Sequence, residues 1–198
     1  MTQTTGLRER KKQKTRDAIQ REALRLFQAQ GYSATTIEQI AAAAEISPST
    51  FFNYFPTKED VVLYDAYDPI LLASLAVGPP GESLSAAFRR ALEGLAVVME
   101  RDREMILLRA KLWLDEPALR ARVWEELERA RDLLTAVMAA RSGRDADDFE
   151  LRIIAMTLVA AAFESSLEWI RQGGEGNLVT YVNRALDVVD ATARLDGL

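Results

Sequence analysis

Short hydrogen-bonding side chains are concentrated in one stretch of the chain, between positions 47 and 54. Side chains of this kind suit phosphate oxygens and the edges of nucleic acid bases when a rigid element presents them in a groove. The stretch holds Ser47, Ser49, Thr50, Asn53 and Tyr54, and Lys58 follows it. The first chemistry that these residues indicate is therefore nucleic acid recognition.

Two short helices are predicted to position these side chains, the first at about 37–44. Thr35 or Thr36 provides an N-cap for this helix, and Glu38 stands near the N3 position of a capping box. Ala41 is small enough to let a second helix approach closely.

Ser47 provides the N-cap of the second short helix, and Pro48 fits its first turn. The apolar residues of both helices have a spacing that predicts one shared core, made of Ile40, Ala44, Ile46, Phe51 and Phe55. A helix-turn-helix of this kind places its second helix in the major groove of DNA.

The charges of the chain are divided unevenly. Residues 1–58 hold nine Lys and Arg against five Asp and Glu, whereas the remaining 140 residues hold 16 against 25. We call residues 1–58 the head and the rest of the chain the body. A basic head on an acidic body indicates that the head binds a polyanion. A solvated basic helix face is the alternative for a charge run alone.

Composition excludes much other chemistry. The chain of 198 residues has no cysteine and no histidine, which excludes disulfides, thiolate nucleophiles, imidazole metal ligands and Ser-His-Asp triads. We expect no metal, no cofactor and no enzymatic activity. No run approaches about 18 uninterrupted apolar residues, so we expect no membrane span, no secretory signal and a cytoplasmic protein.

Helical periodicity extends along the whole chain, and no segment alternates as a strand does, so the fold class is all-α with about nine helices. Gly31 ends a first long helix, and Thr57 caps a helix that extends to about Leu75, with a kink or end at Pro69. Further helices are predicted near 83–101, 103–114, 116–141, 146–172 and 175–194.

Residues from about 10 to 65 resemble the DNA-binding domain of the TetR family of transcriptional regulators. The matching positions are Phe27, Gly31, Tyr32, Thr35, Thr36, Ile37, Ile40, Ala41, Ala44, Ile46, Ser47, Phe51, Tyr54, Phe55, Lys58 and Glu59. The resemblance implies a DNA-binding domain over 1–60, with three helices forming the helix-turn-helix, and a helical effector and dimerisation domain over 61–198.

The resemblance also implies which residues touch DNA. Thr36 would hold a phosphate, Lys58 would contact the DNA backbone, and the arm around Arg8–Lys14 would add electrostatic attraction. The full predicted set is Arg10, Lys11, Lys14, Thr36, Ser47, Pro48, Ser49, Thr50, Phe52, Asn53, Tyr54 and Lys58.

Two positions depart from the family pattern. Glu45 stands at the turn where the family usually has glycine, so a positive φ there would cost about 1 kcal/mol and would bring a carboxylate near a polyanion. Phe52 stands where tyrosine is common and lacks its phosphate-binding hydroxyl.

A homodimer is expected on a near-palindromic double-stranded operator, because one short helix reads only a few base pairs. The segment 153–167 is apolar on nearly every face, which favours a dimer interface made by the last two helices, with a monomer core as the alternative.

A pocket for a small-molecule effector is expected in the acidic body. Its predicted lining residues are Phe88, Met99, Met105, Arg109, Trp113, Met156, Phe163 and Glu164, although residues at such spacing are more often plain core. Arg109 and Glu164 each interrupt an apolar run, and we expect them to pair with each other.

The predicted function is a transcriptional repressor that a small organic ligand releases from its operator. Alternatives are a helical protein-interaction module, an activator of the same family, a DNA binder without effector, or an enzyme built on Glu164 and Glu168. Weak binding of DNA at all salt concentrations would favour the interaction module.

Overall fold

The computed structural model describes residues 3–79 and 81–192, and over these residues it contains helices and no strands. The all-α prediction is therefore confirmed, with eleven helices in the described ranges rather than about nine. They are α1 (Gln3–Gln30), α2 (Ile37–Ala43), α3 (Pro48–Tyr54), α4 (Lys58–Leu63), α5 (Asp68–Ala76), α6 (Leu84–Arg101), α7 (Arg103–Asp115), α8 (Pro117–Arg120), α9 (Val123–Ser142), α10 (Phe149–Arg171) and α11 (Leu178–Thr192).

The larger number of helices comes from two breaks, of which the sequence predicts only the one near Pro69. The predicted helix from 58 to about 75 is two helices, because α4 ends at Leu63 and α5 starts at Asp68 with Pro69 in its first turn. The predicted helix over 116–141 is likewise divided, since α8 ends before Ala121 and α9 begins at Val123.

The chain divides into two compact units. The first comprises the residues up to Asp65 together with Leu108–Ala121, and the second comprises Ala66–Leu107 and the residues from Arg122 onward. The sequence instead predicts a single boundary at residue 60, with 108–121 in the second domain.

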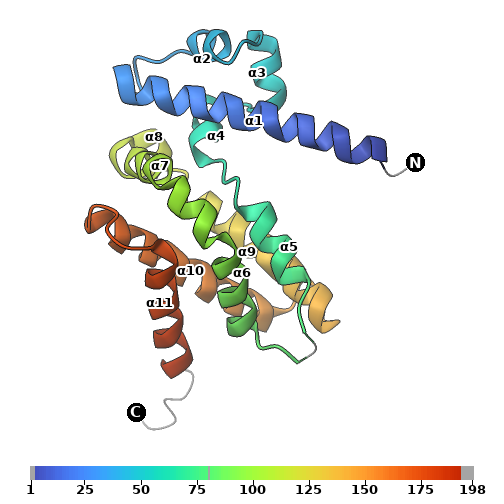
Figure 1. Ribbon diagram of the computed structural model, residues 1–198. Helices are drawn as coiled ribbons and strands as arrows, with labels where there is room; N and C mark the ends of the chain where they lie inside the picture. Colours follow the sequence, from blue (N-terminus) through green and yellow to red (C-terminus); the bar gives the residue numbers. More distant parts are fainter. Residues whose placement is uncertain (1–2, 80, 193–198) are drawn as a thin grey trace. The chain divides into compact units, whose positions relative to one another are not determined.

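In the first unit, α2 and α3 pack beside the long helix α1, as Figure 1 shows. Its core is apolar and tightly closed, and α1, α2, α3 and α4 all contribute to it. The side chains that are less than 4% exposed include Ile19, Leu24, Phe27, Ile40, Phe51, Phe55 and Val61. This core fixes the two short helices on a rigid base, which is what a recognition element needs.

The second unit is a helical bundle, in which α10 packs against both α9 and α11, and α6 contacts α5 and α11 (Figure 1). One continuous hydrophobic core runs through it. Its buried members are Leu75, Ala87, Phe88, Ala91, Leu92, Leu134, Met138, Ala139, Leu151, Ala155, Leu158, Val179, Val182 and Leu186.

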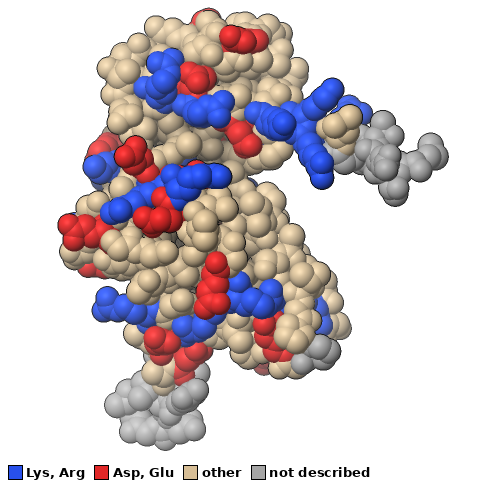
Figure 2. All heavy atoms as spheres, viewed as in Figure 1, with Lys and Arg blue, Asp and Glu red and all other residues tan. Residues whose placement is uncertain are grey.

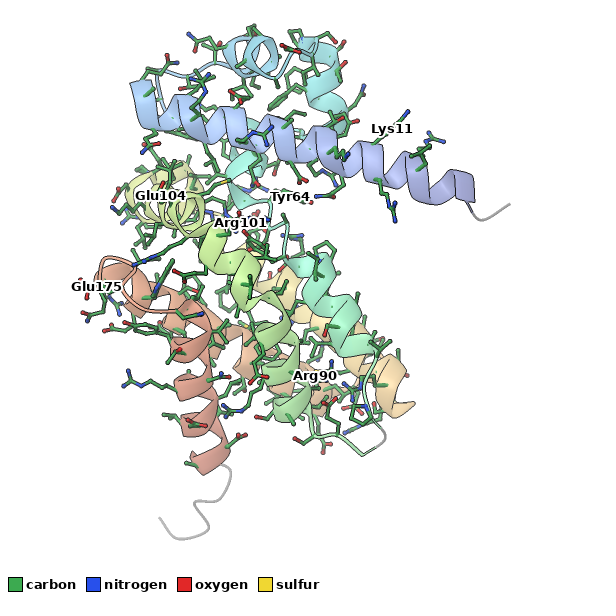
Figure 3. The ribbon with its side chains drawn as sticks, viewed as in Figure 1. Lys11, Tyr64, Arg90, Arg101, Glu104 and Glu175 are labelled. Carbon is green, nitrogen blue, oxygen red and sulfur yellow. The ribbon has the colours of Figure 1, made fainter. Side chains whose placement is uncertain are left out.

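A polar cluster closes the second unit where α5 ends. Arg90 donates from Nε to Glu82 Oε1 at 2.8 Å and from Nη2 to the carbonyl of Val77 at 2.7 Å. Arg141 donates to the carbonyl of Leu75 at 2.8 Å and lies 3.3 Å from Glu82. The two arginines therefore satisfy the last carbonyls of α5, a helix end that has no glycine cap. Arg90 is labelled in Figure 3.

Candidate DNA interface

The turn between α2 and α3 has the geometry of a helix-turn-helix. The amide of Ile46 donates to the carbonyl of Ala41 at 2.9 Å, which reverses the chain within a few residues. Glu45 has φ 55°, and among the described residues it is the sole non-glycine with a positive φ. The expected positive φ at this position is confirmed. The backbone of Glu45 is therefore strained, and glycine at this position would remove the strain.

The predicted side chains of α3 lie on one accessible face. Ser47, Pro48, Ser49 and Asn53 are exposed, and Thr50 and Tyr54 are partly exposed. The opposite face is buried, because Phe51 and Phe55 are 0% and 3% exposed. The polar residues that the sequence singled out are therefore presented together on a seven-residue helix.

Hydroxyl groups at the start of α3 also have a structural role. Ser47 is the N-cap, and its Oγ accepts from the amide of Thr50 at 3.1 Å. The same Oγ lies 2.8 Å from the hydroxyls of both Ser49 and Thr50. This network holds the three hydroxyls close together, so a contact to one of them constrains the others.

Phe52 is the apolar exception on the exposed face, with 52% of its surface accessible. Its ring is edge-on to that of Phe51, with centroids 5.7 Å apart. An exposed ring on a recognition helix has no hydroxyl for a phosphate, but it suits the methyl group of a thymine.

Thr36 is the N-cap of α2, as expected, but its capping partner differs from the prediction. The hydroxyl of Thr36 accepts from the amide of Gln39 at 3.2 Å, and the Gln39 side chain accepts from the amide of Thr36 at 3.0 Å. Gln39, and not Glu38, therefore completes the capping box, because Gln39 occupies the N3 position.

Lys58 lies at the start of α4 and points into the first unit. Its Nζ donates to the carbonyl oxygens of Tyr32 at 2.8 Å and Thr35 at 3.0 Å, and it lies 4.2 Å from the centre of the Tyr32 ring. The ammonium group thus binds the turn between α1 and α2, a contact that the sequence does not predict.

Basic side chains of the arm remain open to solvent. Arg10, Lys11 and Lys14 are exposed on the N-terminal half of α1. Figure 2 shows basic side chains over this part of α1, and Figure 3 shows Lys11 directed away from the helix. Exposed cations on a projecting helix suit phosphate contacts, which need no fixed geometry.

The predicted effector-lining residues are divided between the two units. Arg109 and Trp113 belong to the first unit, and the other six belong to the second. Phe88 is buried in the core of the second unit and Met99 packs against it. Met105, Met156 and Phe163 are partly buried, and Glu164 is exposed.

The predicted pair between Arg109 and Glu164 is wrong. Arg109 Nη2 is 2.6 Å from Asp65 Oδ2, and its Nη1 donates to the carbonyl of Tyr64 at 2.9 Å. The apolar neighbours of Arg109 in the sequence indicate that its charge needs a partner. They do not indicate that this partner is Asp65, which follows α4.

A small cavity lies within the second unit. It has a volume of about 10 Å³, and Phe88 is the one predicted lining residue that borders it. Its walls are Leu75, Leu84, Phe88, Leu134, Val137, Met138, Arg141 and Leu158. Since this volume holds about one water molecule, a larger ligand enters here only if the surrounding side chains move.

The helix α10 has an unusual apolar surface. It is long and apolar enough to cross a membrane by length and composition, with a mean hydropathy of 1.5 over its best window, of which 22% is buried within the chain. Phe149, Ile153 and Ile154 are exposed on α10, and Val188 is exposed on α11. Other apolar residues of these two helices, among them Ala155 in the segment 153–167 and Val182 on α11, lie in the core of their own unit.

The head of the chain defines a class of protein: an all-helical DNA-binding protein with a helix-turn-helix on a basic N-terminal helix. Comparison with known families gives the same result. The model of the bacterial regulatory proteins of the tetR family matches residues 19–64, and the MftR C-terminal domain matches residues 82–194.

Relatives agree with this class. The HTH-type transcriptional regulator TcmR of Streptomyces glaucescens is 41% identical over 175 residues, which are 83% of this chain and 76% of that protein. The FadR repressor of Thermus thermophilus, solved with lauroyl-CoA, is 30% identical with a TM-score of 0.55 and coverage of 87% of this chain and 92% of its own. FadR of Bacillus halodurans has the same fold, with a TM-score of 0.57 at 18% identity, covering 93% of this chain and 96% of its own. The chain belongs to the TetR family of transcriptional regulators, which bind DNA, respond to small molecules and act as dimers.

Proposed function

We propose that the chain is a homodimeric, cytoplasmic repressor that reads a near-palindromic operator with α3 and releases it when a small organic molecule binds the second unit. The observation that carries this proposal is the single accessible face of α3, where Ser49, Asn53 and Tyr54 stand on a buried base of Phe51 and Phe55. In a two-fold dimer, the two copies of α3 read half-sites about 34 Å apart, or a multiple of that distance.

The exposed residues of α10 and α11 support the dimer. Phe149, Ile153 and Val188 are 68%, 53% and 66% exposed in the single chain, although they are large and apolar. Large exposed apolar residues on two neighbouring helices favour an interaction site. We assign it to a second copy of the chain because this family acts as dimers and because α10 and α11 pack directly on each other.

The effector site is proposed at the apolar cavity beside Arg141. The cavity is lined by residues of four helices of the second unit, and its wall is apolar apart from Arg141, whose guanidinium is already bound to the carbonyl of Leu75 and to Glu82. This lining suits an apolar molecule. The Thermus relative, which was solved with lauroyl-CoA, makes fatty acyl compounds the first probes to use.

Selection of binding sites from random duplex DNA tests the function, followed by titration of the selected DNA across salt concentrations. We expect a palindrome and a steep fall of affinity with salt, because several phosphates are neutralised. Asn53→Ala should relax the preference at one position of each half-site, whereas Glu175→Ala, exposed in the second unit, should change nothing. If no sequence is enriched, the proposal fails.

Sedimentation tests the dimer surface. Ile153→Asp and Val188→Asp should each convert the protein to a monomer, since a carboxylate would be buried without a partner. Val97→Asp is the matched control, because Val97 is 81% exposed on α6. If all three variants have the same sedimentation coefficient, the dimer interface lies elsewhere on the chain.

Release of the selected DNA tests the effector site. Lauroyl-CoA and lauric acid are added separately to the complex, first with the wild type and then with Met138→Trp, which should fill the cavity. Release from the wild type and not from the variant supports the site. Equal release from both would exclude this cavity as the place where the ligand binds.

A further inference from the structure

We infer that Arg16 binds a phosphate of the DNA backbone at the edge of the groove that α3 enters. This residue is not among the DNA contacts predicted from the sequence, and it precedes residues 19–64, which match the family model. The inference rests on the proposed DNA binding by α3. It is carried by an arginine whose donors have no acceptor and whose position is fixed by two aromatic rings.

The guanidinium group of Arg16 has no acceptor within the described part of the chain. None of its nitrogens donates a hydrogen bond or forms an ion pair there, and Nε is buried without a partner. The carboxylate of the next residue, Asp17, accepts from Gln13 at 2.7 Å. An arginine carries five N–H donors and a permanent charge, and a partly buried charge normally has a partner. The free donors therefore point to an anion that the chain itself does not supply.

Two aromatic rings hold this guanidinium in place. Its central carbon Cζ lies 5.1 Å from the ring centre of Tyr64 and 5.8 Å from that of Phe55. The two rings are edge-to-face, with centres 5.7 Å apart, and Phe55 is only 3% exposed. Tyr64 is labelled in Figure 3. A ring face attracts a cation without using its N–H groups, so Arg16 is fixed while its donors stay available.

Phe55 places the guanidinium beside the C-terminal end of α3. It is the C-cap of this helix, and its amide donates to the carbonyl of Phe51 at 2.9 Å. A helix with its side chains is about 10–12 Å wide and the major groove of DNA is about 12 Å wide. The end of a helix in this groove therefore lies near a sugar-phosphate backbone, which brings Arg16 within reach of a phosphate.

The side of α1 that carries Arg16 continues as a row of cations. Lys12 and Arg8 precede it by four and eight residues, so the three lie along one side of the helix, and both are exposed. Four residues after Arg16, on the same side, Gln20 is 5% exposed and donates to the carbonyl of Tyr64 at 2.8 Å. This side of α1 thus changes from core to cations at Arg16. Figure 2 shows basic side chains over this half of the helix.

The salt dependence of DNA binding tests the contact. Arg16→Met removes the charge and keeps an unbranched apolar chain over the rings. We expect it to bind the selected operator about eightfold more weakly at about 0.1 M salt, with a slope of log K against log salt that is less steep by about 0.9. A loss of affinity that is equal at all salt concentrations would overturn the inference, because it would assign Arg16 to the fold alone.

Arg25→Met is the matched control. Arg25 lies nine residues further along α1, which is on the opposite side of the helix, and its Nε is 2.8 Å from Glu22. This variant should keep the wild-type slope, and so should Arg16→Lys, which retains the charge. The inference fails if either of them loses as much of the slope as Arg16→Met.

Neutral phosphates locate the contact on the DNA. A set of operators, each with one methylphosphonate in place of a phosphate beside the half-site, is titrated with the wild type and with Arg16→Met. At one position the neutral group should weaken binding of the wild type about as much as Arg16→Met does, and should add nothing in the variant. If no position shows this coupling, Arg16 does not bind a phosphate.

Circular dichroism checks that each variant is folded. If Arg16→Met does not fold, Arg16→Gln is used for the same comparisons, since it is neutral and can still form a hydrogen bond. Failure of the wild type to select any DNA would remove the proposed function itself. Selection of an operator by the wild type, together with an unchanged slope in the neutral variant, would remove only the role of Arg16.

Discussion

Arg109 and Asp65 form an ion pair with Nη2 and Oδ2 2.6 Å apart, which joins the middle of α7 to the residue that follows the C-cap of α4. The same guanidinium donates to the carbonyl of Tyr64. Gln20 of α1 donates to that carbonyl too, at 2.8 Å, and to the carbonyl of Val61 at 2.9 Å. The end of α4 is thus held by side chains from two other helices.

Arg109→Met should lower the free energy of unfolding by about 1–3 kcal/mol, because it removes the cation that pairs with the partly buried Asp65 carboxylate and one of the two donors to the Tyr64 carbonyl. Asp65→Asn should cost less, since the carbonyl bond survives. Denaturant titration of both single variants and the double variant measures the coupling. Coupling of Arg109 to Glu164 in a second cycle would contradict the assigned pair.

Glu45→Gly should stabilise the protein by about 1 kcal/mol, because glycine adopts a positive φ without steric cost. It should also strengthen DNA binding, since a carboxylate is removed from the turn next to α3. Ala44→Gly is the control: Ala44 has φ −84°, so glycine there gains nothing. If both variants behave alike in thermal denaturation, backbone strain at Glu45 is not the cause.

Phe52→Tyr should raise the affinity for DNA several-fold by adding a hydroxyl that reaches phosphate, with the fold unchanged because the ring is already half exposed. The slope of log K against log salt should stay the same, since no charge is added. Fluorescence titration of the selected operator measures both quantities. A fall in affinity would indicate that the Phe52 ring contacts a thymine methyl group instead.

Glu82 makes the stability of the second unit pH-dependent. The hydrogen bond from Arg90 holds the pKa of Glu82 below its ordinary value of 4.5, although desolvation opposes it. A carboxylate with a lowered pKa stabilises the folded state above pH 4.5, and this contribution is lost as the pH falls through the folded value. Thermal unfolding should therefore separate wild type from Glu82→Gln at pH 7, and the difference should shrink in acid. A difference that is constant with pH would exclude this origin.

Much of the first unit could be predicted because its signals are local. Thr36, Ser47 and Thr57 are the N-caps of α2, α3 and α4, and Gly31 ends α1 with φ 90°. Each of these residues acts on backbone groups only a few positions away, so its type and place in the sequence are sufficient.

The features that were missed depend on distant residues. The break between α4 and α5 has one local signal, Pro69 in the first turn of α5, but nothing local marks the end of α4 at Leu63; the carbonyl of Tyr64, which follows it, is satisfied by Gln20 and Arg109. The inward position of Lys58 is similar, since it depends on carbonyls 23 and 26 positions earlier. The sequence Lys-Glu is the same whether the lysine side chain points to a phosphate or to a turn of its own chain, so the sequence does not distinguish the two positions.

The exposed apolar residues of α10 and α11 have a consequence for how the protein behaves at different concentrations in the cell. If Phe149, Ile153 and Val188 are covered only when two chains meet, association and folding share one equilibrium, and dilution weakens both. The melting temperature should then rise with protein concentration. In a cell, a regulator made in a few copies would be partly unassembled and open to proteases, so its own expression level would set the threshold at which its operator is occupied.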